Sequence, residues 1–78
     1  MPLPALRTAL AESRHHGGDH VPPVEIAPDK LADEARKTAA GNRSAAAEYR
    51  TRTDHPSLWA VFAEYQDHHA DALESLLD

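Results

Sequence analysis

Residues 56–77 hold the densest group of large apolar side chains in this chain, and these side chains are spaced like one face of an α-helix. At about 100° per residue, the residues of one side are apolar apart from a single histidine: Leu58, Val61, Phe62, Tyr65, His69, Ala72, Leu73 and Leu76. The other side carries Glu64, Asp67, Asp71 and Glu74. Because such a helix is stable in water only when its stripe is buried, the pattern predicts an all-α fold.

A second helix is predicted over residues 28–53. Pro28 suits a first helical position, acidic residues follow it, and Arg50 and Arg52 close the segment, which complements the helix dipole. The predicted inward face is built mostly of small residues that permit close approach of another helix: Leu31, Ala35, Thr38, Asn42, Ala45, Ala46 and Tyr49. A turn over residues 53–55 leads to Pro56. Residues 28–77 therefore predict a helical hairpin.

The N-terminal part is predicted as a short helix over residues 1–14 and an extended arm over residues 15–27. Leu3, Leu6 and Leu10 have helical spacing, whereas two glycines and three prolines between positions 15 and 28 prevent a helix. Val21, Val24 and Ile26 are too apolar for a free tether. We expect the arm to lie along a helix, either of its own chain or of a neighbouring copy, within one domain spanning residues 1–78.

The core is predicted to be small. Of the 32 apolar residues in the 78-residue chain, 15 are alanine, which buries little area. Ordering a chain costs roughly 1.5 kcal/mol per residue in conformational entropy, and burial of a core of this size offsets that cost only approximately. We therefore expect completion by self-association into a bundle, or by a bound partner.

The charge distribution is uneven. Residues 30–53 carry six basic and three acidic residues, whereas residues 54–78 carry six acidic and no basic residues, so the two helices of the hairpin attract each other. The net charge of −5 disfavours binding to nucleic acid or to an anionic membrane. No apolar run suits a membrane span, no signal peptide is recognisable, and no cysteine is present. The expected location is cytoplasmic.

Six histidines raise the alternative of a divalent transition metal, although no cofactor is the main expectation. Glu64 and His68 stand four residues apart on one helical edge, and with His69 they form the candidate ligand set. The plainer interpretation of Glu64 and His68 is a solvated pair. His69 points into the apolar stripe and is expected to pair with Asn42. The remaining candidates, His15, His16 and His20, are expected to be exposed loop residues.

Residues 42–77 resemble one helix pair of the rubrerythrin branch of the ferritin-like bundles. In that family, a helix ending near a tyrosine is followed by a turn and a helix that closes in Glu-x-x-His-Ala-x-x-Leu. The matching residues here are Tyr49, Leu58, Phe62 and the stretch Gln66-Asp67-His68-His69-Ala70-Asp71-Ala72-Leu73. Gln66 and Asn42 stand where the metal carboxylates would be. The resemblance thus implies a four-helix bundle of two hairpins without di-iron chemistry.

The predicted function is that of a small acidic, non-enzymatic interaction protein, a regulator, inhibitor or assembly factor that occupies the surface of a protein partner. The predicted contact residues are apolar and acidic residues of the last helix: Leu58, Trp59, Phe62, Tyr65, Asp67 and Asp71. Trp59 is interpreted either as an interface anchor or as a cap over the hairpin turn. Two alternatives are a metal-binding or vestigial ferritin-like protein and an inhibitor that mimics nucleic acid. No nucleophile with a positioned base supports an enzyme.

Overall fold

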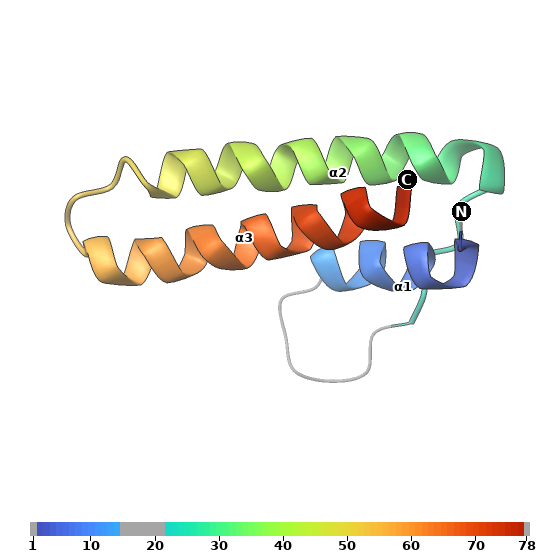
Figure 1. Ribbon diagram of the computed structural model, residues 1–78, viewed down its shortest axis with the longest axis horizontal. Coiled ribbons are helices and arrows are strands. Elements are labelled where there is room, and N and C mark those ends of the chain that lie inside the picture. The colour runs from blue at the N-terminus through green and yellow to red at the C-terminus, as the bar shows by residue number, and fades with distance from the viewer. Residues whose placement is uncertain (1, 15–21, 78) are drawn as a thin grey trace.

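The computed structural model describes residues 2–14 and 22–77, which form three helices and no strand. Helix α1 spans Leu3–Arg14, α2 spans Pro28–Tyr49 and α3 spans Pro56–Leu77. Helices α2 and α3 form an antiparallel hairpin, and α1 lies beside the C-terminal part of α3, as Figure 1 shows. The all-α prediction is confirmed. One chain therefore forms a three-helix bundle at one end and a two-helix hairpin at the other.

The starts of α2 and α3 agree with the sequence prediction, whereas α1 starts at Leu3 instead of residue 1 and α2 ends earlier than predicted. Both Pro28 and Pro56 are first residues of helices, as expected. Helix α2 ends at Tyr49 instead of residue 53, because the next backbone amides turn back into shorter-range hydrogen bonds. Thr51 N donates to Glu48 O at 3.0 Å, and Arg52 N donates to Tyr49 O at 3.2 Å. These bonds tighten the last turn and redirect the chain toward α3.

Alanines form much of the contact between α2 and α3. Ala35 and Ala46 on α2, and Ala63 and Ala70 on α3, are completely buried. Side chains of this size let two helix backbones approach closely, as predicted for the inward face of the second helix. The large buried side chains lie instead where α1 joins the hairpin: Leu6, Leu10, Leu31 and Leu73. The main core is therefore a three-helix contact at the α1 end.

The arm lies along a helix of its own chain, as far as the structure describes it. Val24 N donates to Arg7 O at 3.4 Å, and Arg7 Nη1 donates to Val24 O at 3.0 Å. The side chains of Val24 and Ile26 pack against the core. Residues 22–27 contain neither helix nor strand. The predictions made for Val21 and for the three histidines of residues 15–20 lie outside the described residues.

Gly41 is a glycine that the fold does not require. It lies on the exposed side of α2, and a Cβ atom added to it would meet no other atom within 4 Å. Gly41→Ala is expected to stabilise the protein by about 1 kcal/mol, because alanine loses less backbone entropy in a helix. For a chain of this size, the melting temperature should rise by about 4–8 °C in a thermal scan followed by circular dichroism.

The matched control is Ala47→Gly, at an exposed position of the same helix. This variant should lower the melting temperature by a similar amount. An unchanged melting temperature in the Gly41→Ala variant would contradict the prediction.

Candidate interaction surface

Helix α1 covers only part of the apolar stripe of α3. It has 12 residues, whereas α3 has 22, and it packs on the half of α3 that contains Ala70 and Leu73. Beyond the end of α1, four apolar side chains of α3 remain substantially exposed: Leu58 at 49%, Val61 at 59%, Phe62 at 42% and Tyr65 at 50%. We refer to these four residues as the tip patch. Sequence periodicity had placed all four on the stripe that needs covering.

A shallow groove of about 420 Å³ runs over the tip patch. Val61, Phe62 and Tyr65 line it from the patch, Tyr49 comes from the end of α2, and Trp59 and Gln66 complete it. Most of this lining is aromatic or aliphatic, and the polar side-chain groups are the amide of Gln66, the two tyrosine hydroxyls and the indole N–H of Trp59, which donates to Asp54. A groove of this composition suits an apolar side chain of a partner better than a charged group.

Trp59 holds the tip of the hairpin together. Its ring stacks on Tyr49 with the centroids 5.4 Å apart and meets Phe62 edge-on at 5.5 Å. The guanidinium carbon of Arg52 lies 4.5 Å from the centroid of the Trp59 ring, and Nε1 donates to Asp54 Oδ1 at 2.8 Å. These contacts confirm the interpretation of Trp59 as a cap over the turn. Its role as an interface anchor stays a prediction.

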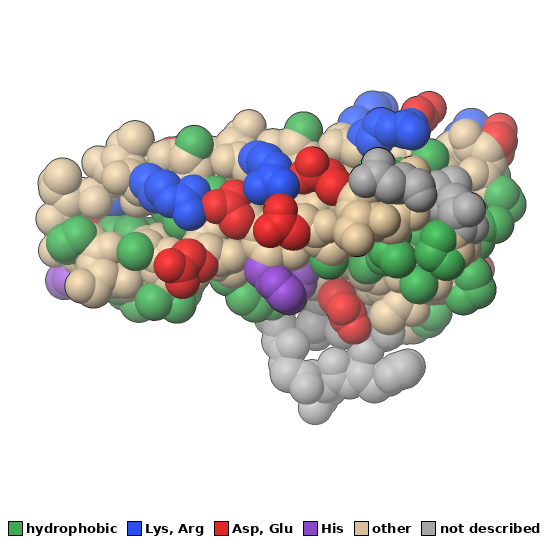
Figure 2. Space-filling model, in the orientation of Figure 1, with side chains coloured by type: hydrophobic (Ala, Val, Ile, Leu, Met, Phe, Trp, Pro, Cys, Tyr) green, Lys and Arg blue, Asp and Glu red, His purple; other side chains and the backbone are tan. Residues whose placement is uncertain are grey.

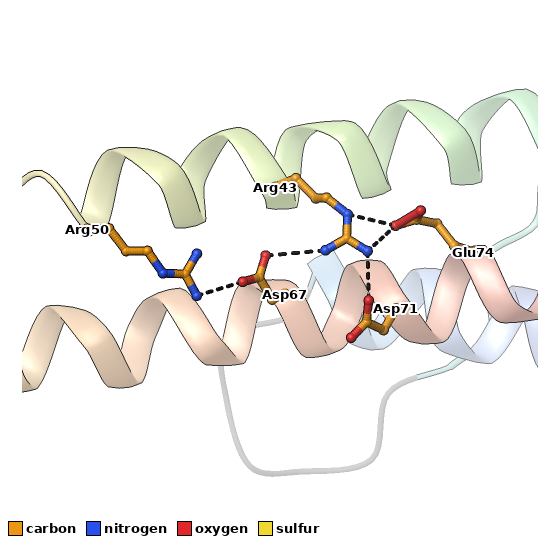
Figure 3. Close-up of polar contacts among 5 residues, drawn as sticks. All are labelled: Arg43, Arg50, Asp67, Asp71 and Glu74. Carbon is orange, nitrogen blue, oxygen red and sulfur yellow. Dashed lines mark hydrogen bonds and ion pairs between the residues drawn. The ribbon is translucent and has the colours of Figure 1, made fainter.

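Three acidic residues of α3, Asp67, Asp71 and Glu74, bind arginines of the basic helix, as the opposite charges of the two segments predicted. Arg43 Nη2 donates to Asp71 Oδ1 at 2.7 Å, Arg43 Nε donates to Glu74 Oε1 at 2.9 Å, and Arg43 Nη1 reaches Asp67 Oδ1 at 3.4 Å. Arg50 Nη2 also donates to Asp67, to Oδ2 at 2.7 Å. Figure 3 shows these two arginines and three carboxylates, which we call the arginine ladder.

The arginine ladder runs along one edge of the seam between α2 and α3, where Figure 2 shows blue and red side chains gathered together. The hydrogen bonds that Arg43 donates, first to Asp71 and second to Glu74 in size of effect, raise the pKa of Arg43 above its ordinary value. Most of these side chains remain substantially exposed, so water and salt weaken each pair. The ladder already pairs Asp67 and Asp71, which were predicted to contact a protein partner.

His68 and His69 of α3 do not belong to a cluster of potential metal ligands among the described residues. His68 and His69 have ring centroids 6.1 Å apart, and His69 packs edge-on against Tyr65 at 4.4 Å. Within residues 2–14 and 22–77, no three His, Asp or Glu side chains come together to hold a metal ion. The ligand set of Glu64, His68 and His69 stays a prediction.

Asn42 connects α2 to α1 by a hydrogen bond. Its Nδ2 donates to Ser13 Oγ of α1 at 2.7 Å, although the sequence had suggested a pair with His69. Asn42 is buried, and Ser13 of α1 supplies the partner that a buried amide needs. The sequence did not reveal this bond, because the two residues are 29 positions apart.

No protein-family model matches the chain, and the comparisons with curated proteins and with solved structures found no match. The likeness of residues 42–77 to the rubrerythrin helix pair therefore stays an expectation from sequence. In the part of the chain that the structure describes, no helix combines the length and apolar character that crossing a membrane needs.

Proposed function

We propose that this chain is a small non-enzymatic protein-interaction module that acts by occupying the surface of a partner through the tip patch. The observation that carries the proposal is the exposure of Leu58, Val61, Phe62 and Tyr65 side by side on one helix. Exposing such a group to water is unfavourable, and a contiguous apolar patch with aromatic residues is typical of a protein contact site. Regulator, inhibitor and assembly factor all remain within this class.

The partner that suits the tip patch is an amphipathic helix. Helix α1 already packs on the same stripe of α3 through leucines spaced at helical intervals. The stripe continues past the end of α1 with residues at similar spacing, so a helix of another chain finds the same kind of surface there. One large apolar side chain of that helix would enter the groove between Tyr49 and Phe62.

The apolar tip is a better contact site than the acidic side of α3. Asp67 and Asp71 already bind Arg43 and Arg50, so a basic partner would have to displace these arginines. Rim charges also contribute more to association rate than to affinity. A mimic of nucleic acid needs an unpaired row of carboxylates, whereas Asp67 and Asp71 are paired with arginines.

The test is a retention experiment with four forms of the immobilised chain in an extract of the cells that encode it. Wild type, Phe62→Leu and Asp71→Lys are expected to retain the same protein, whereas Phe62→Glu should lose at least about 90% of it, because a carboxylate is costly to bury without a partner. Phe62→Leu is the matched control, since it keeps an apolar side chain at the same position.

Circular dichroism must show equal helical content in all four forms. Retention that survives Phe62→Glu but is lost with Asp71→Lys would overturn the proposal in favour of an electrostatic contact. Retention of no protein by the wild type, at a bait concentration of about 10 µM, would overturn the interaction function itself.

A further inference from the structure

We infer that the tip patch is covered, in the absence of its partner, by the tip patch of a second copy of this chain, with the two α3 helices antiparallel. The inference rests on the proposed function, because both use the same surface. The inference adds that the occupant of the patch is a second copy and that the two copies are related by a two-fold axis. Binding of the partner would therefore compete with dimerisation. Four observations favour a second copy: the spacing of the patch, its charge, its direction and its area.

The spacing of the tip patch is symmetric. Val61 and Phe62 flank its centre, and Leu58 and Tyr65 lie three and a half positions to either side. A two-fold axis through that centre places Leu58 of one copy opposite Tyr65 of the other and Val61 opposite Phe62. Large residues thus meet smaller ones, which favours interdigitated packing. A two-fold contact of this kind uses the same surface on both copies, as most homodimers do.

The charge around the patch permits two copies to meet there. The chain carries a net charge of −5, so copies repel each other at most surfaces. From Pro56 to Ala63, however, α3 contains no charged residue. The carboxylates of Asp67, Asp71 and Glu74 lie in the arginine ladder, where Arg43 and Arg50 partly neutralise them. The uncharged run from Pro56 to Ala63 is therefore the section of this acidic helix best suited to self-contact, and Glu64 is the carboxylate that lies next to it.

The direction of α1 fits the same geometry. Figure 1 shows α1 running antiparallel to α3 along the C-terminal half of that helix, which leaves the first half of α3 without a helix on that side. A second α3 that packs antiparallel on the tip patch would run in the same direction as α1 and start close to its end. The two hairpins would then form a local four-helix bundle in which each stripe is covered along its whole length. The established contact of α1 with α3 continues directly into the proposed one.

The area predicts a reversible dimer. Aromatic and similar side chains have roughly 150–250 Å² of surface, so four side chains about half exposed present on the order of 400 Å² per copy. Together with parts of Tyr49 and Trp59 on both copies, the contact comes to about 1,000 Å², which is at the low end of specific interfaces. Such a dimer exchanges readily, so a partner helix can replace the second copy.

The test uses single-cysteine variants, because the chain contains no cysteine. Leu58→Cys and Tyr65→Cys are mixed under mild oxidation, and each is also oxidised alone. In the antiparallel dimer the mixture should form a disulfide-linked pair of one copy of each variant. Either variant alone should form no disulfide-linked dimer. Two copies of the same position lie about 10 Å apart along the helix axis, which is beyond the reach of a disulfide. Ala47→Cys, on the exposed side of α2, is the control for random collisions.

Sedimentation of the wild type is expected to give twice the mass of one chain at high concentration, with a melting temperature that rises with concentration. Phe62→Glu should weaken the dimer about 100-fold or more, and Phe62→Leu should weaken it much less. A wild type that stays monomeric at about 1 mM, or equal cross-linking of each variant with itself, would overturn the inference. If the wild type is monomeric but Phe62→Glu abolishes partner retention, the inference fails and the proposed function stands. If the wild type dimerises but Phe62→Glu leaves partner retention unchanged, only the proposed function fails.

Discussion

Leu10→Ala is expected to destabilise the protein by about 3 kcal/mol and to lower its melting temperature by about 15 °C. Leu10 is completely buried in the core cluster where α1 meets α2 and α3. Its loss leaves a cavity at the junction that holds α1 in place. Because a domain of this size has only about 4–12 kcal/mol of stability, this change removes a large fraction of it. Urea denaturation followed by circular dichroism measures the free energy of unfolding.

Leu58→Ala is the matched control, since it removes the same atoms from a side chain that is 49% exposed. Measured at a low protein concentration, where a second copy does not contribute, it should cost less than about 1 kcal/mol. The difference between the two variants isolates the contribution of burial. Equal losses would show that α1 does not pack as described.

Trp59→Ala is expected to destabilise the protein by about 2–3 kcal/mol, although Trp59 is only half buried. The indole connects the end of α2 to the start of α3 through its stack on Tyr49, its edge contact with Phe62 and its hydrogen bond to Asp54. Without it, the two helices lose their main contact near the turn. A thermal scan by circular dichroism measures the loss, which should appear as a melting temperature lower by about 10 °C or more.

Two milder variants separate the contributions of Trp59. Trp59→Phe keeps an aromatic ring but loses the hydrogen bond, and Asp54→Ala removes only its acceptor, so each should cost about 1 kcal/mol. If Trp59→Ala melts at the same temperature as the wild type, the turn is held by other contacts.

The sequence allowed the element order, the helix starts and the antiparallel hairpin to be predicted. Pro28 and Pro56 identified the starts because proline fits the first turn of a helix and few positions within it. The opposite charges of the two segments predicted their attraction, and Arg43 and Arg50 indeed pair with carboxylates of α3. These features depend on neighbouring residues or on the summed charge of a segment, so they can be predicted from the sequence alone.

The orientation of α3 could not be predicted, because alanines and not the large apolar residues of its stripe make the contact with α2. Ala63 and Ala70 occupy that contact instead, and this turns Asp67 and Asp71 toward Arg43. Alanine contributes little to a hydrophobic pattern, yet it permits the closest packing of two helices. A pattern weighted by side-chain size thus misjudged which side of the helix is inside.

The tip patch was predictable in its members but not in its exposure. Helical periodicity selected Leu58, Phe62 and Tyr65. Their exposure depends on where α1 docks and on how far its 12 residues reach along α3. That position is set by contacts between residues far apart in the sequence, such as Ser13 with Asn42. The spacing of residues along the sequence does not indicate such long-range contacts.

Because α1 braces only one end of the hairpin, the two ends should differ in how often their backbone hydrogen bonds open. Amide protons of α2 near Leu31 and Ala35, and of α3 near Leu73, lie inside the three-helix core and should exchange with solvent deuterium only when the whole domain unfolds. Amide protons of the helix ends that meet at Trp59 should exchange by local separation of two helices, many times faster. The tip of the hairpin would then open while the end covered by α1 stays folded, so hydrogen exchange there would report local opening and not unfolding of the whole domain.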